Sequence, residues 1–261
     1  MTRRPYTLLV HQTEYDLRAF RRNRQACLGT ILLPLLLLVV IVSANGGDTV
    51  PYHHARVSLA EYITPGLAAF GVVAASFLSL IVEVVTQRET GVLKRRRATP
   101  VPAWVLIGGR TLTAAVASLA VMFLLLVVAG NSYNATIPSA GLPAAVLAVA
   151  IGAASFASIG FAVSTAVRNA AAAQPVASLI LLPLLLISSV LVPTTQLPDS
   201  LATIASLFPL EHLADALRYA LDPSVGGSHV AAEDLAVVSA WGVAGFVVAY
   251  RRFAWLPAVS G

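Results

Sequence analysis

The sequence predicts an all-α integral membrane protein with six transmembrane helices, an amphipathic N-terminal helix at the membrane interface and short helices between the spans. Two observations predict this class. Hydrophobic residues make up 57% of the 261 residues and charged residues only 11%, whereas charged residues make up about a quarter of a typical soluble domain. A chain of this length holds roughly six helices of about 20 residues with their loops, and leaves no room for a soluble catalytic domain.

The N-terminal segment, residues 1–26, has the pattern of an amphipathic helix that lies along the membrane surface as an anchor. Its apolar residues recur at intervals of three or four and are Tyr6, Leu9, Val10, Leu17 and Phe20. The polar residues opposite them are His11, Glu14, Arg18, Arg21 and Arg22. The segment is too long and too polar for a signal peptide, so we expect it to stay on the mature protein.

Six apolar segments follow, and we place the spans at about 27–43, 63–82, 104–129, 143–167, 175–192 and 235–250. The middles of these spans carry no Asp, Glu, Lys, Arg or His. Because charged groups at membrane depth are costly and tend to be functional, their absence argues against an ion-coupled pump or a proton relay. Glu83 and Arg110 fall at the ends of the second and third spans, where they either extend to the interface or form a gate.

The loop between the second and third spans is the most informative segment, because five of the seventeen basic residues lie between Arg88 and Arg97. We expect Gly91 to break the helix that leaves the membrane, and Val92 and Leu93 to enter an apolar cleft on a soluble partner. The side chains that would set the register of this contact by charge are Arg88, Glu89, Lys94 and Arg95. The alternative is a plain basic loop that only determines orientation.

The segment 193–234 predicts two short amphipathic helices joined at Pro209, which would pack in the outer leaflet as a lid. The first apolar face comprises Leu197, Leu201, Ile204, Ala205 and Phe208. The second comprises Leu213, Ala216, Leu217, Ala220 and Leu221, and Arg218 lies in the same helix. The alternative is a helix pair that merely stabilises the sixth span.

Small residues at helical spacing indicate close contacts between helices. They are Gly109, Thr113 and Ala117 in the third span, Ala148, Gly152, Gly160 and Ser164 in the fourth, and Gly242 and Gly245 in the sixth. Five serines are candidates for lining a substrate path: Ser76, Ser79, Ser178, Ser188 and Ser189. The alternative is that their hydroxyls bond the preceding helical turn, as most membrane serines do.

The distribution of charge predicts that both termini are cytoplasmic. In that orientation fifteen of the seventeen basic residues lie on the cytoplasmic side, and only Arg56 and Arg218 lie outside. Eight of the twelve acidic residues lie in the outer segments. This asymmetry follows the positive-inside rule, and it explains the basic character of the chain without nucleic acid as a partner.

No motif of a membrane enzyme is present. Gly-x-Ser-x-Gly, His-Glu-x-x-His and the phosphate-binding Gly-x-x-x-x-Gly-Lys-Ser are all missing from the sequence. The pair His53-His54 has no further ligand at suitable spacing, and the single cysteine, Cys27, excludes internal disulfides and thiolate clusters. We therefore expect no metal, no cofactor and no nucleotide hydrolysis in this chain. A membrane-embedded enzyme or accessory subunit is the alternative class.

Together these features resemble the permease subunit of a type-2 ABC exporter, of the drug-resistance type found in bacteria. The family's coupling helix follows the pattern Arg-Glu-x-Gly-Thr-Leu-x-Arg-Leu-x-x-x-Pro. The similar stretch here is Arg88-Glu89-Thr90-Gly91-Val92-Leu93, then Arg95 and Ala98-Thr99-Pro100, with Val92 in place of Thr and Arg96 in place of Leu. The family's outer re-entrant helices are similar to Leu197-Pro198, Phe208-Pro209-Leu210 and Arg218.

The resemblance implies one permease domain over 1–261, made of the N-terminal helix (1–26), spans one to five (27–192), the outer helices (193–234), and span six with a cytosolic tail (235–261). It implies two partners, an ABC ATPase subunit that carries ATP and Mg²⁺, and a second permease subunit in a homo- or heterodimer. It implies export of a hydrophobic or amphipathic compound, a drug or a lipid-like molecule, across the bacterial plasma membrane. Lipid or glycan export by the same family is the alternative.

Overall fold

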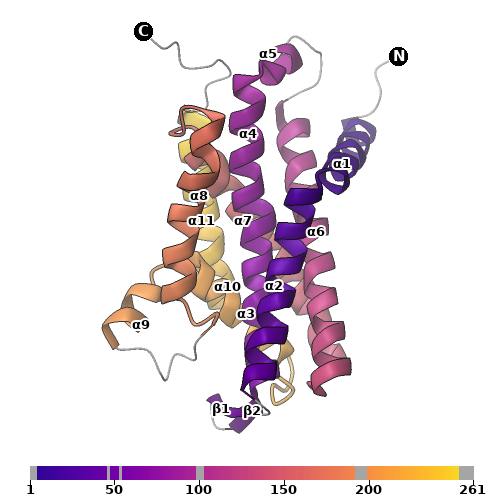
Figure 1. The fold of residues 1–261 in the computed structure, drawn as a ribbon, viewed down its shortest axis with the longest axis vertical. Coiled ribbons are helices and arrows are strands. Elements are labelled where there is room, and N and C mark those ends of the chain that lie inside the picture. The colour runs from indigo at the N-terminus through magenta and orange to yellow at the C-terminus, as the bar shows by residue number, and fades with distance from the viewer. Residues whose placement is uncertain (1–4, 46–47, 53–54, 98–102, 192–198, 253–261) are drawn as a thin grey trace.

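A computed structural model describes residues 5–45, 48–52, 55–97, 103–191 and 199–252 of the chain (Figure 1). Within these residues six helical segments are long and apolar enough to cross a membrane, so the chain is an all-α, multi-pass membrane protein. The short helix α5 lies at one end of the bundle and the β1–β2 hairpin lies at the other (Figure 1). We call these the α5 end and the hairpin end.

The helices follow one another in the order that the hydropathy predicts. The structure also contains a β-hairpin that the hydropathy does not predict. In the first half they are α1 (Pro5–Arg22), α2 (Arg24–Ala44), β1 (Thr49–Tyr52), β2 (Ala55–Ser58), α3 (Leu59–Val73), a π-helical turn (Ala74–Leu78), α4 (Ser79–Glu89) and α5 (Val92–Arg97). In the second half they are α6 (Ala103–Tyr133), a 3₁₀ turn (Ser139–Gly141), α7 (Leu142–Ser164), α8 (Ala170–Ile187), α9 (Asp199–Ala205), α10 (Pro209–Leu221) and α11 (Ala232–Arg252).

The six predicted spans are confirmed, with shifted boundaries. The second is much longer than the predicted 63–82 and runs from Leu59 to Glu89. It begins early because Ser58 and Glu61 form a capping box, in which the Ser58 hydroxyl accepts from the Glu61 N–H and the Glu61 carboxylate accepts from the Ser58 N–H. The Glu61 carboxylate also accepts from the Thr136 N–H at 2.8 Å, which joins this helix start to the loop between α6 and α7.

The hairpin was not predicted, because four-residue strands that contain Pro51 give almost no periodic signal. The two strands pair antiparallel, with Thr49 opposite Ser58 and Tyr52 opposite Ala55. Tyr52 packs edge-to-face on Tyr62 of α3 at a centroid distance of 5.7 Å. The hairpin therefore sits over the start of the second span.

The second span is the centre of the bundle. In its most apolar stretch 78% of the residues are buried, compared with 22% in α2 and 22% in α8. The largest side chains that it buries completely are Ile63, Leu67, Val72, Val73, Ile81 and Val84. The outer helices leave large apolar side chains exposed, as expected where lipid replaces protein.

The close helix contacts predicted from small residues are confirmed for several positions. A Cβ on Gly152 of α7 would lie 2.8 Å from Leu213 of α10, and one on Gly160 would lie 3.2 Å from the Phe77 carbonyl in the π-helical turn. On α11, a Cβ on Gly245 would lie 2.8 Å from the Ile159 backbone nitrogen of α7. The small residues therefore let α7 approach three other elements of the same chain.

The predicted N-terminal helix is present as α1, and it packs on α6. A Cβ on Gly109 of α6 would lie 2.6 Å from Gln12, and the Thr113 hydroxyl donates to the Thr13 carbonyl at 3.4 Å. Away from this contact, Val10 and Tyr15 of α1 are exposed. The contact with α6 is thus made largely by polar residues, which leaves apolar side chains for the membrane.

Candidate functional site

The helix leaving the second span ends at Gly91, as the sequence predicts. Gly91 has a φ of +70°, a left-handed conformation that glycine adopts without strain, and its N–H donates to the Arg88 carbonyl at 3.2 Å. The Gly91 carbonyl then accepts from the Arg95 N–H at 3.1 Å, within the first turn of α5. The turn therefore holds α5 at a defined angle to α4.

The side chains of α5 divide between the bundle and the solvent. Leu93 is only 4% exposed and packs in a cluster with Leu80, Phe161 and Ala249. Lys94 and Arg95 are exposed. We expected Leu93 to enter a cleft on a partner, but within this chain it anchors α5 to the bundle. The residues 98–102 and the side chains of 96–97 lie outside the described part of the chain.

Arg88 and Glu89, which the sequence analysis assigned to a partner, bond to the turn between α7 and α8. Arg88 is buried and donates to the Ser164 carbonyl at 3.1 Å and to the Val167 carbonyl, while the Glu89 carboxylate accepts from the Ala170 N–H. A helix end leaves carbonyls without partners at its C-terminus and N–H groups without partners at its N-terminus. Arg88 satisfies carbonyls at the end of α7, and Glu89 satisfies an N–H group at the start of α8. We call these contacts the inner clamp.

Arg110 forms a second polar group at the α5 end, between α4 and α6. It is buried, donates to the Gln87 side-chain carbonyl, and lies 3.6 Å from the Glu83 carboxylate. The Gln87 amide in turn donates to Glu83 at 2.7 Å. Arg110 therefore packs inside the protein and joins α4 to α6.

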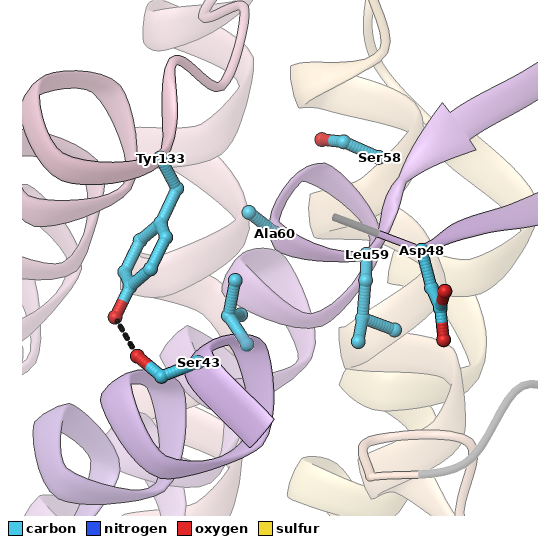
Figure 2. A pocket seen from close by; sticks show the side chains of 7 residues that line it. Ser43, Asp48, Ser58, Leu59, Ala60 and Tyr133 are labelled. Carbon is cyan, nitrogen blue, oxygen red and sulfur yellow. Dashed lines mark hydrogen bonds between the residues drawn. The ribbon is translucent and has the colours of Figure 1, made fainter. Parts of the chain in front are cut away.

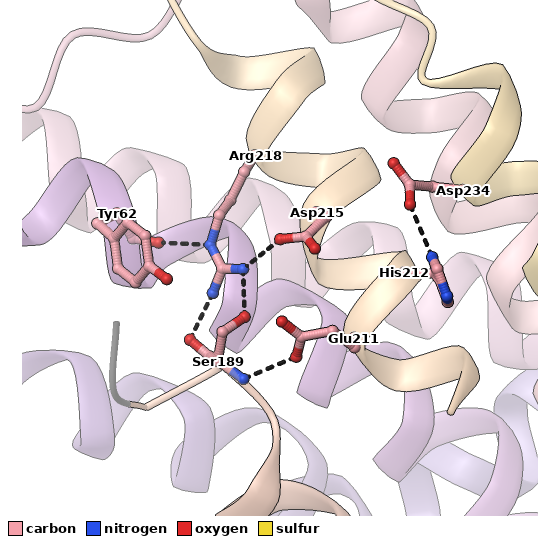
Figure 3. A network of polar contacts seen from close by, with 7 residues as sticks. All are labelled: Tyr62, Ser189, Glu211, His212, Asp215, Arg218 and Asp234. Atoms are coloured by element: carbon pink, nitrogen blue, oxygen red, sulfur yellow. Dashed lines mark hydrogen bonds and ion pairs between the residues drawn. The ribbon is translucent and has the colours of Figure 1, made fainter. Parts of the chain in front are cut away.

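At the hairpin end, Arg218 of α10 is the centre of a buried polar cluster (Figure 3). Its guanidinium donates to the Ser189 hydroxyl and the Ser189 carbonyl, both at 2.6 Å, and to Asp215 at 2.8 Å. It also lies 4.3 Å from the centre of the Tyr62 ring, a cation–π distance. The Glu211 carboxylate accepts from the Ser189 N–H at 2.7 Å. We call the contacts of Ser189 with Glu211 and Arg218 the outer clamp.

Burial and neighbouring charges shift the pKa values of two residues on α10, Asp215 and His212. Burial raises the pKa of Asp215, although the neighbouring Arg218 favours the ionised carboxylate. His212 lies on the same helix, 2.7 Å from Asp234 of α11 and 2.9 Å from the Ser206 carbonyl. Burial opposes protonation of His212, but its bonds to Asp234 and the Ser206 carbonyl, together with the charges of Asp234 and Asp215, outweigh burial and raise its pKa. The cluster therefore holds α10 to α3, to α11 and to the residues that follow α8.

The residues assigned to an outer lid lie partly inside the bundle. Pro209 is the first residue of α10 and is buried, and Leu213 is fully buried against Gly152 of α7. Phe208 stacks on Trp241 of α11 with ring centres 6.4 Å apart. The side chain of Leu201, which lies in α9, and the residues 192–198 are outside the described part. Within the described residues, α10 is thus packed more deeply than a helix resting on the surface.

The five candidate path serines have mostly local partners. The hydroxyls of Ser76, Ser79 and Ser188 donate to carbonyls of their own preceding turns. Ser178 accepts from the Gln174 amide at 3.3 Å, one turn earlier in the same helix. Ser189 alone among the five takes part in a contact between distant segments, and it does so with all three of its polar groups.

A pocket of about 210 Å³ opens at the hairpin end between α2, α3 and the end of α6. Figure 2 shows the hydrogen bond of 2.9 Å between the Ser43 and Tyr133 hydroxyls on one side of it. Asp48 and Leu59 line the other side. The volume is below the roughly 300–1,000 Å³ of small-molecule sites, and none of the five candidate serines lines it.

Sequence reasoning assigned no partner to Glu211, did not single out Asp215, and placed Ser189 only among the candidate path residues. The spacing of Glu211, Asp215 and Arg218 was a usable signal, because residues three or four apart share one face of a helix. Three charged residues on one side of a helix that is otherwise apolar indicate partners inside the protein. The partner itself, the backbone after α8, has no signature in the sequence.

The family model described as ABC-2 family transporter protein matches residues 44–251, well over half of the chain. The match runs from the end of α2 to the end of α11 and includes both clamps. No curated protein matches the chain.

Proposed function

This chain belongs to the ABC-2 family of transporter proteins, and we propose that it is the transmembrane permease subunit of an ATP-driven exporter. In this proposal the exporter moves a hydrophobic or amphipathic compound, a drug or a lipid-like molecule, out of the cell. A separate ABC ATPase subunit binds ATP and Mg²⁺ and hydrolyses the nucleotide. The family match supports the class of protein and its association with an ATPase, and the geometry supports where that association takes place.

We place the α5 end on the cytoplasmic side of a bacterial plasma membrane. The helix α1, the helix α5 and the end of α11 lie at this end of the bundle, and their basic residues include Arg21, Arg22, Lys94, Arg95 and Arg251 (Figure 1). The hairpin end carries acidic residues in α10 and at the start of α11. This distribution follows the positive-inside rule and supports the orientation.

We propose that α5 is the coupling helix, and the observation that carries this is its division into two sides. Leu93 anchors it to the bundle, Gly91 sets its angle, and Lys94 and Arg95 are presented to solvent. A short helix that is firmly held and exposes two cations is suited to dock on an ATPase surface of complementary charge. Because both Arg88 and Glu89 are occupied within the chain, they hold the helix in place and do not contact the partner in this proposal.

A second permease subunit, identical or related, would complete the transporter. The spans α2 and α8 bury only 22% of their residues within this chain. The path for substrate is then formed between two subunits, whose packing changes as the ATPase dimer closes. Lipid or glycan export remains the alternative within this class.

The experiment that tests the proposal reverses the two exposed charges of α5. We expect the double variant Lys94→Glu, Arg95→Glu to insert and fold, but to co-purify at least about tenfold less of its ATPase, since the charges meet like charges at the contact. Efflux of ethidium, an amphipathic dye, is measured in the same cells. The matched control is Arg56→Glu, an exposed arginine at the hairpin end that should change neither quantity. Equal ATPase yield from the double variant and the control would refute docking through α5.

A further inference from the structure

The helix α8 packs on the second span through one narrow face, and hydrogen bonds join both of its ends to neighbouring elements. Only 22% of its residues are buried, and Leu179 and Leu186 are 74% and 70% exposed. By contrast, 78% of the apolar stretch of Leu59–Glu89 is buried. The buried residues of α8 are Ala173, Ala177, Leu181 and Leu185, which form one stripe along its length against α4 and the π-helical turn. The rest of its surface is exposed or only partly covered by the described part of this chain, so α8 can shift as one helix when a bonded end is displaced.

The end of α8 near α5 is bonded through the inner clamp. The Glu89 carboxylate accepts from the N–H of Ala170, the first residue of α8, and Arg88 donates to two carbonyls between α7 and α8. Both residues directly precede the Thr90–Gly91 turn into α5. Any movement of α5 therefore acts on the start of α8 through Glu89, and on the end of α7 and the turn after it through Arg88.

The opposite end of α8 is bonded through the outer clamp. Ser189 follows Ile187, the last residue of α8, by two positions, and it is fully buried. Its N–H donates to Glu211 at 2.7 Å, and its carbonyl and hydroxyl each accept from Arg218 at 2.6 Å (Figure 3). Hydrogen bonds in which one partner is ionised are the stronger ones, so this end is firmly joined to α10.

We infer that α8 is a mechanical link that transmits displacement of α5 to α10. This inference rests on the proposed function and names the route by which that function operates. Glu89 and Arg88 at one end, and Glu211, Arg218 and Ser189 at the other, are positioning residues of the transport cycle. ATPase closure moves α5, the inner clamp moves the start of α8, and the outer clamp moves α10 against α3, α7 and α11.

The test follows the hairpin end while nucleotide acts at the α5 end. Ser206 is exposed between α9 and α10, and its carbonyl bonds His212 of α10. The variant Ser206→Cys in a Cys27→Ala background carries one reporter thiol. In the complete complex with its ATPase, we expect trapping with ATP and vanadate to change the maleimide labelling rate by at least about fivefold.

Cutting either end of the link should abolish that change. We expect the Ser206→Cys reporter to be labelled at the same rate with and without nucleotide when Glu211→Ala is added. We expect the same result when Glu89→Ala is added instead. Glu211→Gln should restore the response, because the amide oxygen accepts the same Ser189 N–H. Glu233→Ala is the matched control, since Glu233 is an exposed carboxylate at the hairpin end. Thermal unfolding of each complex identifies a variant that has failed to fold. If one alanine variant fails to fold, the alanine variant at the other end of α8 tests the inference.

Two results would overturn the inference. One is a change in labelling rate with nucleotide that persists in both alanine variants. The other is no change in labelling rate in the reporter chain without these substitutions, while its ATPase hydrolyses ATP. Failure of the proposed function gives a different result, because no ATPase would then co-purify with the parent chain. A response lost in both alanine variants and restored by Glu211→Gln supports the link.

Discussion

The buried cluster around Arg218 at the hairpin end and the exposed face of α5 use charge in opposite ways. At the hairpin end Glu211 and Arg218 are buried and, with Asp215, bond one another or the backbone near Ser189, so these charges are satisfied within the chain. At the α5 end Lys94 and Arg95 face solvent. Buried charges are costly to leave without partners, whereas exposed charges contribute little to stability and remain available to bind. Changes in this buried cluster should therefore affect folding, and changes to the exposed face of α5 should affect association.

The largest expected effect is at Arg218. Replacement of Arg218 by Leu leaves Asp215 without its cation and the Ser189 carbonyl without a donor, which should cost about 3–5 kcal/mol of stability. Thermal unfolding in detergent measures the loss. Arg56→Leu removes the other hairpin-end arginine, which is exposed, and should cost at most about 1 kcal/mol. Equal losses from the two variants would show that the buried cluster does not hold α10.

A smaller effect is expected from packing at the same end. A Cβ on Gly141 would lie 1.7 Å from the Ala220 carbonyl oxygen of α10, so Gly141→Ala must displace backbone. We expect a loss of about 2 kcal/mol, comparable with other overpacked sites. Gly226→Ala, where no atom lies within 4 Å, is the control and should be close to neutral. If both glycines tolerate alanine equally, α10 is held less closely than the structure indicates.

The smallest effect is a pH dependence at His212. Its pKa is raised in the folded protein by Asp234, with Asp215 acting in the same direction, despite opposing burial. The stabilisation is therefore fully present below the ordinary histidine pKa of about 6.5 and is lost as pH rises through the raised value. We expect His212→Gln to lower the melting temperature more at about pH 6 than at about pH 9, by a difference worth less than about 1 kcal/mol. A pH-independent difference would mean that His212 is held as the neutral form.

Sequence reasoning succeeded where the signal is local. The six spans, the helix break at Gly91 and the close approach at Gly152, Gly160 and Gly245 all follow from hydropathy, backbone freedom or residue size. It failed for the hairpin, where two short strands carry no periodicity, and for the start of the second span. There the capping box of Ser58 and Glu61 begins the helix four residues before the predicted boundary.

The sequence by itself determined the membrane class, the number and order of the spans and the asymmetry of charge, because each is a property of composition summed over a segment. Only the tertiary structure decided what individual polar residues do. Arg88 and Glu89 sit in a motif that suggests an external partner, yet Arg88 bonds the end of α7 and Glu89 bonds the start of α8. Arg218 donates to the Tyr62 carbonyl, which is 156 residues away in the sequence, and to the Ser189 carbonyl just after α8. A buried polar side chain takes whichever partner the packing brings within about 3 Å, and packing depends on every element at once.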